Sequence, residues 1–343
     1  MKTSDPGRRV LVTGAGGFIG SHLAADQSNR GRQVVSLDLD LSRLRHLRDA
    51  SRFDLLEGDV ADVSLQASAL DGVDTVFHLA AAHLSVRAGE AAFRRVNVDA
   101  VSDLVRQAKT SGVRRFVHCS TVGVYGPILA PPANEGTPCR PEIAYERTKL
   151  EGEKVVLRAA AEDGLPVVVV RPVWVYGPGC PRTEKLFRTI ARGTFLMAGP
   201  GDALRHCVYI RDMLDAFELA ATADSALGQV VIVGNSAAVR VRDLLSEIAA
   251  LVEARPPRSI PLWALHAAGT IAETVFGIAG REPPLSRRTL KFFTANTAFD
   301  ITRARTVLGY EPRYDLEAGL RETHAAIASG RFHDIPLPGP QAG

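Results

Sequence analysis

Short apolar runs alternate along the chain with longer stretches in which apolar residues recur at helical spacing. The apolar runs cover residues 10–13, 33–37, 54–56, 74–79, 115–119 and 166–170. This alternation predicts an α/β fold, in which crossover helices join the strands of a parallel sheet. The run at 166–170 is apolar on both faces, so we expect it deep in the sheet, covered by helices on either side. A later run, at 229–233, should return to the same sheet.

Beyond Pro172 the pattern becomes irregular, because proline and glycine cluster at 177–181 and 199–201. We therefore predict a large domain and a smaller C-terminal substrate-binding lobe that is interleaved with it. The predicted boundaries are 8–174 with about 208–237 for the large domain, about 175–207 with 238–330 for the lobe, and 333–343 for a disordered tail.

Residues 260–278 form a long apolar segment within the predicted lobe. His266 and Glu273 interrupt it, which argues against a span through a membrane. An amphipathic helix that covers a hydrophobic pocket, or that rests on a membrane surface, fits the pattern. An ordinary core helix of the lobe fits it as well.

Composition narrows the class of protein. The chain has 343 residues, 46% of them hydrophobic, and a net charge of only +3 without a long Lys/Arg block, which gives no support for a nucleic-acid partner. The four cysteines, at 119, 139, 180 and 207, are widely spaced, so we expect thiols in a reducing cytoplasm and no metal site. A polar start, followed by an apolar stretch cut by glycines, predicts neither a secretory signal nor an early transmembrane helix.

A glycine-rich turn follows the first apolar run and precedes a helical pattern that resumes at Ser21. Gly14, Gly17 and Gly20 suit the three roles of a dinucleotide site: a tight turn, close approach of the backbone to a pyrophosphate, and packing of helix on strand. This order is typical of a Rossmann-type doubly wound parallel sheet. The second run ends at Asp38, where a carboxylate can accept a hydrogen bond from a ribose hydroxyl.

The carboxylate of Asp38 would repel a 2′-phosphate, so the sequence favours NAD over NADP as the cofactor. Arg43 is the nearest basic residue and the one feature nearby that would suit NADP.

Tyr145 and Lys149 are four residues apart, which on a helix places the phenol and the ammonium on one face. A phenol has a pKa of about 10, and a neighbouring cation lowers it. The pair could therefore transfer a proton, although a surface pair would have the same spacing. Ser120 and Thr121 follow the run at 115–119, at the strand end where ligands bind in open α/β sheets, so a hydroxyl there could hold a substrate oxygen.

Together these motifs resemble the extended short-chain dehydrogenase/reductase superfamily, the NAD-dependent epimerase/dehydratase type, over residues 10–325. The resemblance rests on Thr-Gly-x-x-Gly-x-x-Gly at 13–20, Asp38, Asp59-Val60, His-Leu-Ala-Ala at 78–81, Asn97, Ser120-Thr121, Tyr-x-x-x-Lys at 145–149 and Arg-Pro-x-x-Val-Tyr-Gly-Pro at 171–178. It implies that Thr121, Tyr145 and Lys149 are catalytic, and that Lys149 also holds the nicotinamide ribose and lowers the pKa of Tyr145. It also implies a homodimer built on the helices near 97–111 and 144–162.

The resemblance further implies a set of residues that bind the dinucleotide. These are Gly14, Gly17 and Gly20 with the backbone of Phe18 and Ile19 at the pyrophosphate, Asp38 at the adenosine ribose, Asp59 and Val60 at the adenine, and Ala80, Ala81, Pro172 and Val173 at the nicotinamide. Several candidates also have a purely structural interpretation. Asp59 could cap the next helix, Ser120 could support the site from behind, His78 and Asn97 could be buried and hydrogen-bonded, and His83, Arg87 and His206 could only line the cleft.

The substrate is the least determined part of the prediction. Val122-Gly123 stands where the family's 4,6-dehydratases have an Asp-Glu pair, so dehydration is not expected. Trp174 replaces an asparagine that contacts substrate phosphate in many sugar-nucleotide enzymes, and an indole favours an apolar substrate. Arg205, in contrast, matches a position at which epimerases clamp a diphosphate. Residues 284–312 resemble the 3β-hydroxysteroid and sterol-4-carboxylate dehydrogenase branch.

We therefore expect an NAD(P)-dependent oxidoreductase that interconverts a secondary alcohol and a ketone on an apolar small molecule, with His83, Trp174 and Arg205 at the substrate. One alternative is a nucleotide-sugar 4-epimerase. Another is a non-catalytic dinucleotide-sensing protein, but such a sensor would not need Thr121, Tyr145 and Lys149.

Overall fold

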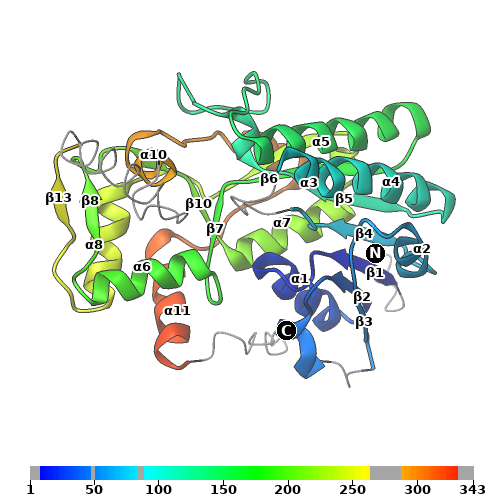
Figure 1. The fold of residues 1–343 in the computed structure, drawn as a ribbon, viewed down its shortest axis with the longest axis horizontal. Coiled ribbons are helices and arrows are strands. Elements are labelled where there is room, and N and C mark those ends of the chain that lie inside the picture. The colour runs from blue at the N-terminus through cyan, green and yellow to red at the C-terminus, as the bar shows by residue number, and fades with distance from the viewer. Residues whose placement is uncertain (1–7, 48–50, 83–88, 263–286, 331–343) are drawn as a thin grey trace.

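The computed structural model describes residues 8–47, 51–82, 89–262 and 287–330. Its centre is a seven-stranded parallel sheet with the order β11-β6-β5-β4-β1-β2-β3 (Figure 1). The strands are β1 (Arg9–Thr13), β2 (Gln33–Asp38), β3 (Phe53–Glu57), β4 (Thr75–His78), β5 (Arg115–Cys119), β6 (Val167–Pro172) and β11 (Val230–Val233). Each coincides with a predicted apolar run to within two residues, and the predicted doubly wound α/β fold is confirmed. The strand order reverses between β1 and β4, which is where such sheets bind their ligands.

Helices cover both faces of the sheet (Figure 1). One face packs against α1 (Phe18–Asn29) and α7 (Ile210–Thr222), and the other against α2 (Val63–Ala69), α4 (Ala100–Thr110) and α5 (Ala144–Asp163). The short helices α3 (Glu90–Arg94) and η2 (Arg95–Asp99) lead into α4. All six residues of β6 are buried, as its two-sided apolar pattern predicts. Homodimerisation through α4 and α5 stays a prediction.

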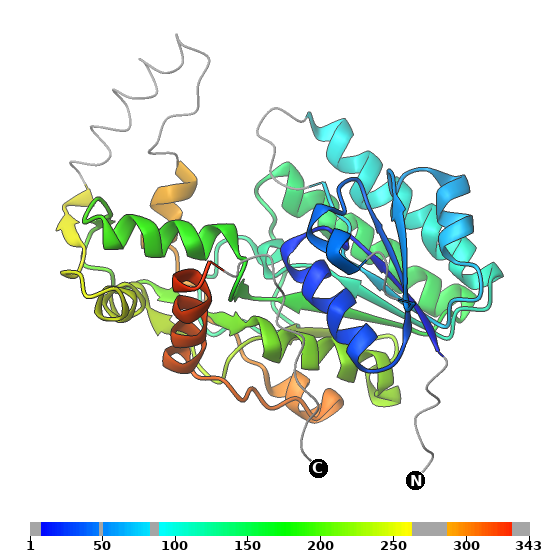
Figure 2. The same ribbon diagram turned by 90° about the horizontal axis from the view of Figure 1, so that it is seen from below.

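Most of the remaining elements lie to one side of the sheet, where α6, α8, α10 and α11 gather (Figure 2). These helices are α6 (Pro181–Ala191), α8 (Val241–Leu251), α10 (Arg287–Thr294) and α11 (Leu316–Ala328). Short helical segments occur elsewhere along the chain: η1 (Ser42–Leu47), η3 (Val122–Tyr125), η4 (Asp224–Ala226) and η5 (Ala304–Leu308). Short strands pair as β7 (Trp174–Tyr176) with β10 (Cys207–Tyr209), β8 (Leu196–Ala198) with β13 (Arg258–Ile260), and β9 (Leu204–Arg205) with β12 (Val239–Arg240). Strands of two or three residues are too short to leave a periodic signal.

The division into a large domain and an interleaved lobe stays a prediction. Most of the apolar segment 260–278, and the whole of the predicted tail 333–343, lie outside the described residues. Within the described part of the chain, no helix combines the length and the apolar character needed to cross a membrane.

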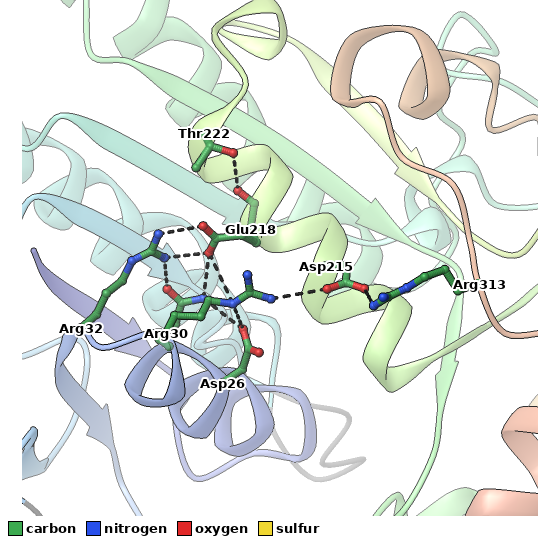
Figure 3. A network of polar contacts seen from close by, with 8 residues as sticks. Asp26, Arg30, Arg32, Asp215, Glu218, Thr222 and Arg313 are labelled. Atoms are coloured by element: carbon green, nitrogen blue, oxygen red, sulfur yellow. Dashed lines mark hydrogen bonds and ion pairs between the residues drawn. The ribbon is translucent and has the colours of Figure 1, made fainter. Parts of the chain in front are cut away.

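Ion pairs fasten α1, whose N-terminus adjoins the glycine turn, to α7 (Figure 3). Both guanidinium NH groups of Arg32 donate to the carboxylate of Glu218 at 2.7 Å. Arg30, the residue directly after α1, pairs with Asp26 of α1 at 2.7 Å and reaches Asp215 of α7 at 3.4 Å. Asp215 also pairs with Arg313, from the segment before α11. The network holds α1 in place from its C-terminal end.

Candidate active site

The glycine turn between β1 and α1 has the three-part construction that a dinucleotide site requires. Gly14 has φ +72°, and a Cβ there would lie 2.7 Å from the amide nitrogen of Ala80. A Cβ on Gly20 would lie 2.0 Å from the carbonyl oxygen of Gly14, so only glycine lets α1 pack this closely on the turn. A Cβ on Gly17 would have its nearest neighbour at 3.2 Å, again the Gly14 oxygen, so little of this chain lies against Gly17. The backbone at Gly17 is therefore open to a ligand, while Gly14 and Gly20 serve the fold.

Helix α1 begins at Phe18, three residues earlier than the helical pattern predicted. Gly17, with φ −70° and ψ 172°, is its N-cap. The glycines obscure the apolar periodicity of the first turn, which explains the shift. The N–H groups at Phe18 and Ile19 therefore belong to a helix N-terminus, which favours a bound phosphate.

Asp38 lies beside this turn at the end of β2. Its Oδ2 accepts from the backbone N–H of Gly16 at 2.9 Å, and its Oδ1 accepts from that of Asp40 at 3.3 Å. A Cβ on Gly16 would lie 1.7 Å from the carbonyl oxygen of Asp40, so Gly16 is needed for the turn to approach the loop after β2. The sequence prediction did not include Gly16, although its place in the glycine run was a signal. Arg43 donates to the carbonyl of Gly179 at 3.1 Å.

Asp59 and Val60 follow β3, and Ala80 and Ala81 follow β4, so all four lie at the same edge of the sheet as Asp38. Asp59 accepts from the N–H of Ala61 at 2.9 Å and pairs with Arg95 at 2.8 Å. The alternative in which Asp59 caps the next helix is wrong. The cap of α2 is Asp62, whose carboxylate accepts from Ser64 and Leu65.

The chain's groups along this edge fit a dinucleotide. The open backbone at Gly17 suits a pyrophosphate, and the half-exposed carboxylate of Asp38 suits a ribose hydroxyl.

Lys149 connects the face of α5 that carries Tyr145 to the end of β5. Its side chain is only 3% exposed, and its Nζ donates to the carbonyl oxygen of Cys119 at 2.7 Å. Two residues further on, Thr121 is the N-cap of η3 and accepts from the N–H of Gly123 through its Oγ1 at 3.1 Å. The structure thus brings Lys149 to the strand end that carries Thr121, and Tyr145 lies one helical turn before Lys149 on α5.

Burial raises the pKa of Tyr145 above the usual value for a phenol. Cys119 and Glu146 raise this pKa further, whereas Arg182, in the first turn of α6, lowers it. The sequence predicted that Lys149 would lower the pKa of Tyr145, but burial and the described side chains together raise it. Burial also lowers the pKa of Lys149 itself. Together these effects favour the phenol form of Tyr145, which suits it to donate a proton.

Among the neighbouring polar residues, Asn97 and His78 have hydrogen-bond partners within the protein, whereas the Ser120 hydroxyl has none among the described residues. Asn97 is buried, accepts from the N–H of Ala82 at 2.9 Å and donates to the hydroxyl of Thr148 at 3.0 Å, so it connects the segment after β4 to α5. His78 bonds through Nδ1 to the hydroxyl of Thr13 at 2.8 Å. Ser120 is buried, and its hydroxyl has no hydrogen-bond partner among the described residues.

The interpretation of His206 as a residue that lines the cleft is wrong. It is 2% exposed, its Nε2 donates to the carbonyl of Asn235 at 2.7 Å, and its Nδ1 accepts from the N–H of Phe299 at 3.2 Å. His83 and Arg87 lie outside the described residues.

The two described substrate candidates contact the same aromatic side chain. The half-buried ring of Trp174 meets that of Phe292 edge to face, with centroids 6.1 Å apart. Arg205 lies over the Phe292 ring at 4.7 Å and donates to the carbonyls of Phe292 at 3.0 Å and Lys291 at 2.6 Å, and to the hydroxyl of Thr297 at 3.2 Å. Burial lowers the pKa of Arg205 to about 10. Arg205 therefore donates to two of the last four carbonyls of α10.

Buried histidines should make the protein sensitive to acid. Burial lowers the pKa of His78 from 6.5 to about 3 and that of His118 well below its usual range. Between these values and pH 6.5 the unfolded chain binds more protons than the folded one, so the free energy of unfolding falls as the pH falls. For His78 alone the full window corresponds to about 5 kcal/mol. Urea unfolding between neutral and mildly acidic pH measures this slope.

A His118→Phe variant removes one buried imidazole whose pKa is lowered, and it should flatten the pH dependence. His46, which is exposed, provides the matched control, because His46→Gln should leave the slope unchanged. An equal slope in the wild type and in His118→Phe would contradict the prediction.

Comparison with known proteins identifies the family of the chain. A family model described as the NAD dependent epimerase/dehydratase family matches residues 10–234. The chain is 28% identical to an uncharacterized UDP-glucose epimerase, YtcB, of Bacillus subtilis, over 94% of this chain and 98% of that protein. It is 27% identical to a 3 beta-hydroxysteroid dehydrogenase/Delta 5-->4-isomerase of Mycobacterium tuberculosis, over 92% of this chain and 89% of that protein. A solved structure, MoeE5 in complex with UDP-glucose and NAD, is 29% identical with a TM-score of 0.75, over 94% of this chain and 99% of that one.

Proposed function

The chain belongs to the NAD-dependent epimerase/dehydratase family and is an NAD-dependent enzyme of the extended short-chain dehydrogenase/reductase type, and we propose that it interconverts a secondary alcohol and a ketone on an apolar substrate. We assign the proton transfer to Tyr145, the orientation of the substrate oxygen to Thr121, and contact with the apolar body of the substrate to Trp174.

The hydrogen bonds of Arg205 carry this proposal. A diphosphate clamp must offer its guanidinium to the substrate, but here Nε and both terminal nitrogens donate within the protein, two of the three to backbone carbonyls of α10. To bind a diphosphate, Arg205 would have to give up these hydrogen bonds, and the carbonyl of the half-buried Phe292 would lose the donor that Arg205 supplies. Arg205, the residue that most favoured a sugar-nucleotide substrate in the sequence, thus already donates its hydrogen bonds within the protein.

The aromatic pair supports the same conclusion. Trp174 and Phe292 are in contact and are both half-buried, so part of each side chain stays accessible to a bound molecule. Phe292 also meets Phe293 edge to face at 5.1 Å, and Phe293 lies 6.1 Å from Phe195. Rings of this kind bury apolar area efficiently and offer little to a charged diphosphate.

In the proposed reaction the chain's own groups hold the substrate oxygen and move its proton. The hydroxyl of Thr121 orients the oxygen, and the oxygen of Tyr145 exchanges the proton with it. The Nζ of Lys149, which donates to the Cys119 carbonyl, lies on the same face of α5 as Tyr145. NAD+, held at the glycine turn and Asp38, would supply the hydride acceptor for this oxidation. Since burial favours the phenol form of Tyr145, added positive charge must assist the oxidation direction.

A second candidate is a nucleotide-sugar 4-epimerase. It is favoured by the similarity to YtcB and to a structure that contains UDP-glucose and NAD. In that reaction the same residues would oxidise the sugar and then reduce the rotated ketone on its other face. The two candidates differ in net chemistry, because an epimerase produces no net NADH.

A spectrophotometric screen for NAD+ reduction separates the two candidates. Steroid and aliphatic secondary alcohols and UDP-sugars would be supplied in parallel, with product analysis of the sugars. We expect net NADH with at least one apolar alcohol and no conversion of the sugars. Conversion of a UDP-sugar to its 4-epimer without net NADH would contradict the proposal.

Variants of Trp174 extend the screen. Trp174→Asn should lower kcat/KM for an apolar alcohol roughly 30-fold, since it removes an aromatic contact worth about 2 kcal/mol. Trp174→Phe keeps an aromatic ring and serves as the matched control. If the enzyme is an epimerase, Trp174→Asn should instead improve turnover of the UDP-sugar.

A further inference from the structure

A buried ion pair joins α5 to β6 behind the candidate catalytic residues. Arg171 and Glu153 are 5% and 2% exposed. The guanidinium Nε of Arg171 donates to one carboxylate oxygen of Glu153 at 3.0 Å, and a terminal nitrogen donates to the other. The pair is thus bidentate, which fixes the orientation of both side chains as well as their separation.

Tyr125 is the third member of this cluster. The remaining terminal nitrogen of Arg171 donates to the Tyr125 hydroxyl at 2.6 Å, and the guanidinium carbon lies 4.8 Å from the centre of the Tyr125 ring. Tyr125 is 1% exposed and is the last residue of η3, the turn that begins directly after Thr121. One guanidinium therefore contacts both α5 and the turn that positions Thr121.

The spacing along α5 connects the cluster to the acid/base pair. Tyr145, Lys149 and Glu153 follow one another at intervals of four residues, so they lie on one face of the helix. Glu153 also raises the pKa of Lys149 against the effect of burial, which shows that the two side chains are electrostatically coupled. A shift of Glu153 would thus move the face that carries Lys149 and Tyr145.

A buried ion pair is a poor source of stability, because removing two charges from water costs about as much free energy as their attraction returns. Its definite contribution is geometric. Here the geometry relates the two elements whose relative position decides whether Thr121 and Tyr145 can reach one substrate oxygen.

We propose that Glu153, Arg171 and Tyr125 form a positioning unit that holds the Thr121 turn against the Tyr145–Lys149 face of α5. The unit acts through Thr121 and Tyr145 and contacts neither substrate nor cofactor. This inference rests on the proposed function, since it takes Thr121 and Tyr145 to be the reacting groups.

Tyr125→Phe tests the unit with the smallest change, because it removes one hydroxyl and leaves the buried ion pair intact. Tyr310→Phe is the matched control. Tyr310 is also 1% exposed, and its hydroxyl donates to the carbonyl of Gly234 at 3.1 Å, away from α5 and η3. Both variants should lose melting temperature to a similar degree.

Amide hydrogen exchange follows the position of the turn without any substrate. The N–H of Gly123, bonded to Thr121 Oγ1, and that of Gly126, bonded to the Gly123 carbonyl at 3.0 Å, report on the turn. We expect both to exchange on the order of tenfold faster in Tyr125→Phe, and unchanged in Tyr310→Phe. Unchanged exchange in Tyr125→Phe would overturn the proposal.

Kinetics with the best alcohol from the screen give the second readout. A loosened turn misplaces Thr121, so kcat should fall on the order of tenfold in Tyr125→Phe with KM little changed, and stay at the wild-type value in Tyr310→Phe. Faster exchange with unchanged kcat would also overturn the proposal, because the turn would then have no influence on the reaction. If the wild type oxidises no alcohol, the proposed function fails, while hydrogen exchange still decides whether the unit holds the turn.

Discussion

Replacing Tyr145 by phenylalanine should remove nearly all turnover and leave NAD binding intact. The substitution removes one oxygen and keeps the aromatic ring, which lies 6.4 Å from that of Phe93 in an edge-to-face contact. A positioned acid or base contributes 10²–10⁴-fold to the rate, so we expect kcat to fall by about this factor. Turnover of the best alcohol and NAD+ affinity, measured by quenching of protein fluorescence, check the two halves of the prediction.

Tyr314→Phe provides the control. Tyr314 is half-buried like Tyr145, and its hydroxyl accepts from Arg211 at 3.4 Å, away from α5. This variant should keep both turnover and affinity. The Tyr145 result does not depend on which substrate is correct, because a dehydrogenase and a 4-epimerase both begin by removing a hydroxyl proton. Normal turnover in Tyr145→Phe would therefore contradict the mechanism for either reaction.

The central sheet could be predicted from the sequence because its strands are buried on both faces. Val167, Val168, Val169 and Val170 are all fully buried, and an uninterrupted apolar run is what such an environment requires. The pairs β7–β10, β8–β13 and β9–β12 could not be predicted in the same way. Their strands have two or three residues, and their partners lie from 33 to 62 positions away along the chain.

In the candidate site, too, features set by local sequence could be predicted, and features set by contacts distant in the sequence could not. Gly14, Gly20 and Asp38 could be found because their roles depend on local backbone geometry, which the order of residues reveals directly. The state of Arg205 could not, since its partners are the carbonyls of a helix about 86 residues further along. The rise in the pKa of Tyr145 could not be predicted from the sequence either. It is set first by burial, and the spacing to Lys149 carries no information about burial.

Changing Gly17 to alanine should mainly weaken NAD+ binding, whereas the same change at Gly20 of the same turn should mainly lower stability. In Gly17→Ala the new methyl group would meet only the Gly14 oxygen, at 3.2 Å, so the variant should lose much less stability than Gly20→Ala, where the contact would be 2.0 Å. The methyl group would, however, occupy the place where the backbone must approach a pyrophosphate. We expect NAD+ affinity to fall on the order of 100-fold, a loss of about 2.7 kcal/mol of binding free energy.

In Gly20→Ala the methyl group would lie 2.0 Å from the Gly14 oxygen, which forces α1 away from the turn. Overpacking of this kind costs about 1–3 kcal/mol, so this variant should lose stability before any ligand is added. Gly136→Ala controls for the substitution itself, because its nearest neighbour would be the side chain of Asn134 at 3.3 Å in an exposed loop. It should keep both stability and affinity.

Thermal unfolding and NAD+ titration of the three variants separate the two roles of the turn. Stability should fall most in Gly20→Ala, whereas the main effect of Gly17→Ala should be a loss of NAD+ affinity. Normal NAD+ affinity in Gly17→Ala would mean that the dinucleotide does not lie over this turn. The assignment of the sheet edge at Asp38 as the cofactor site would then be wrong, even though the fold and the family remain as they are.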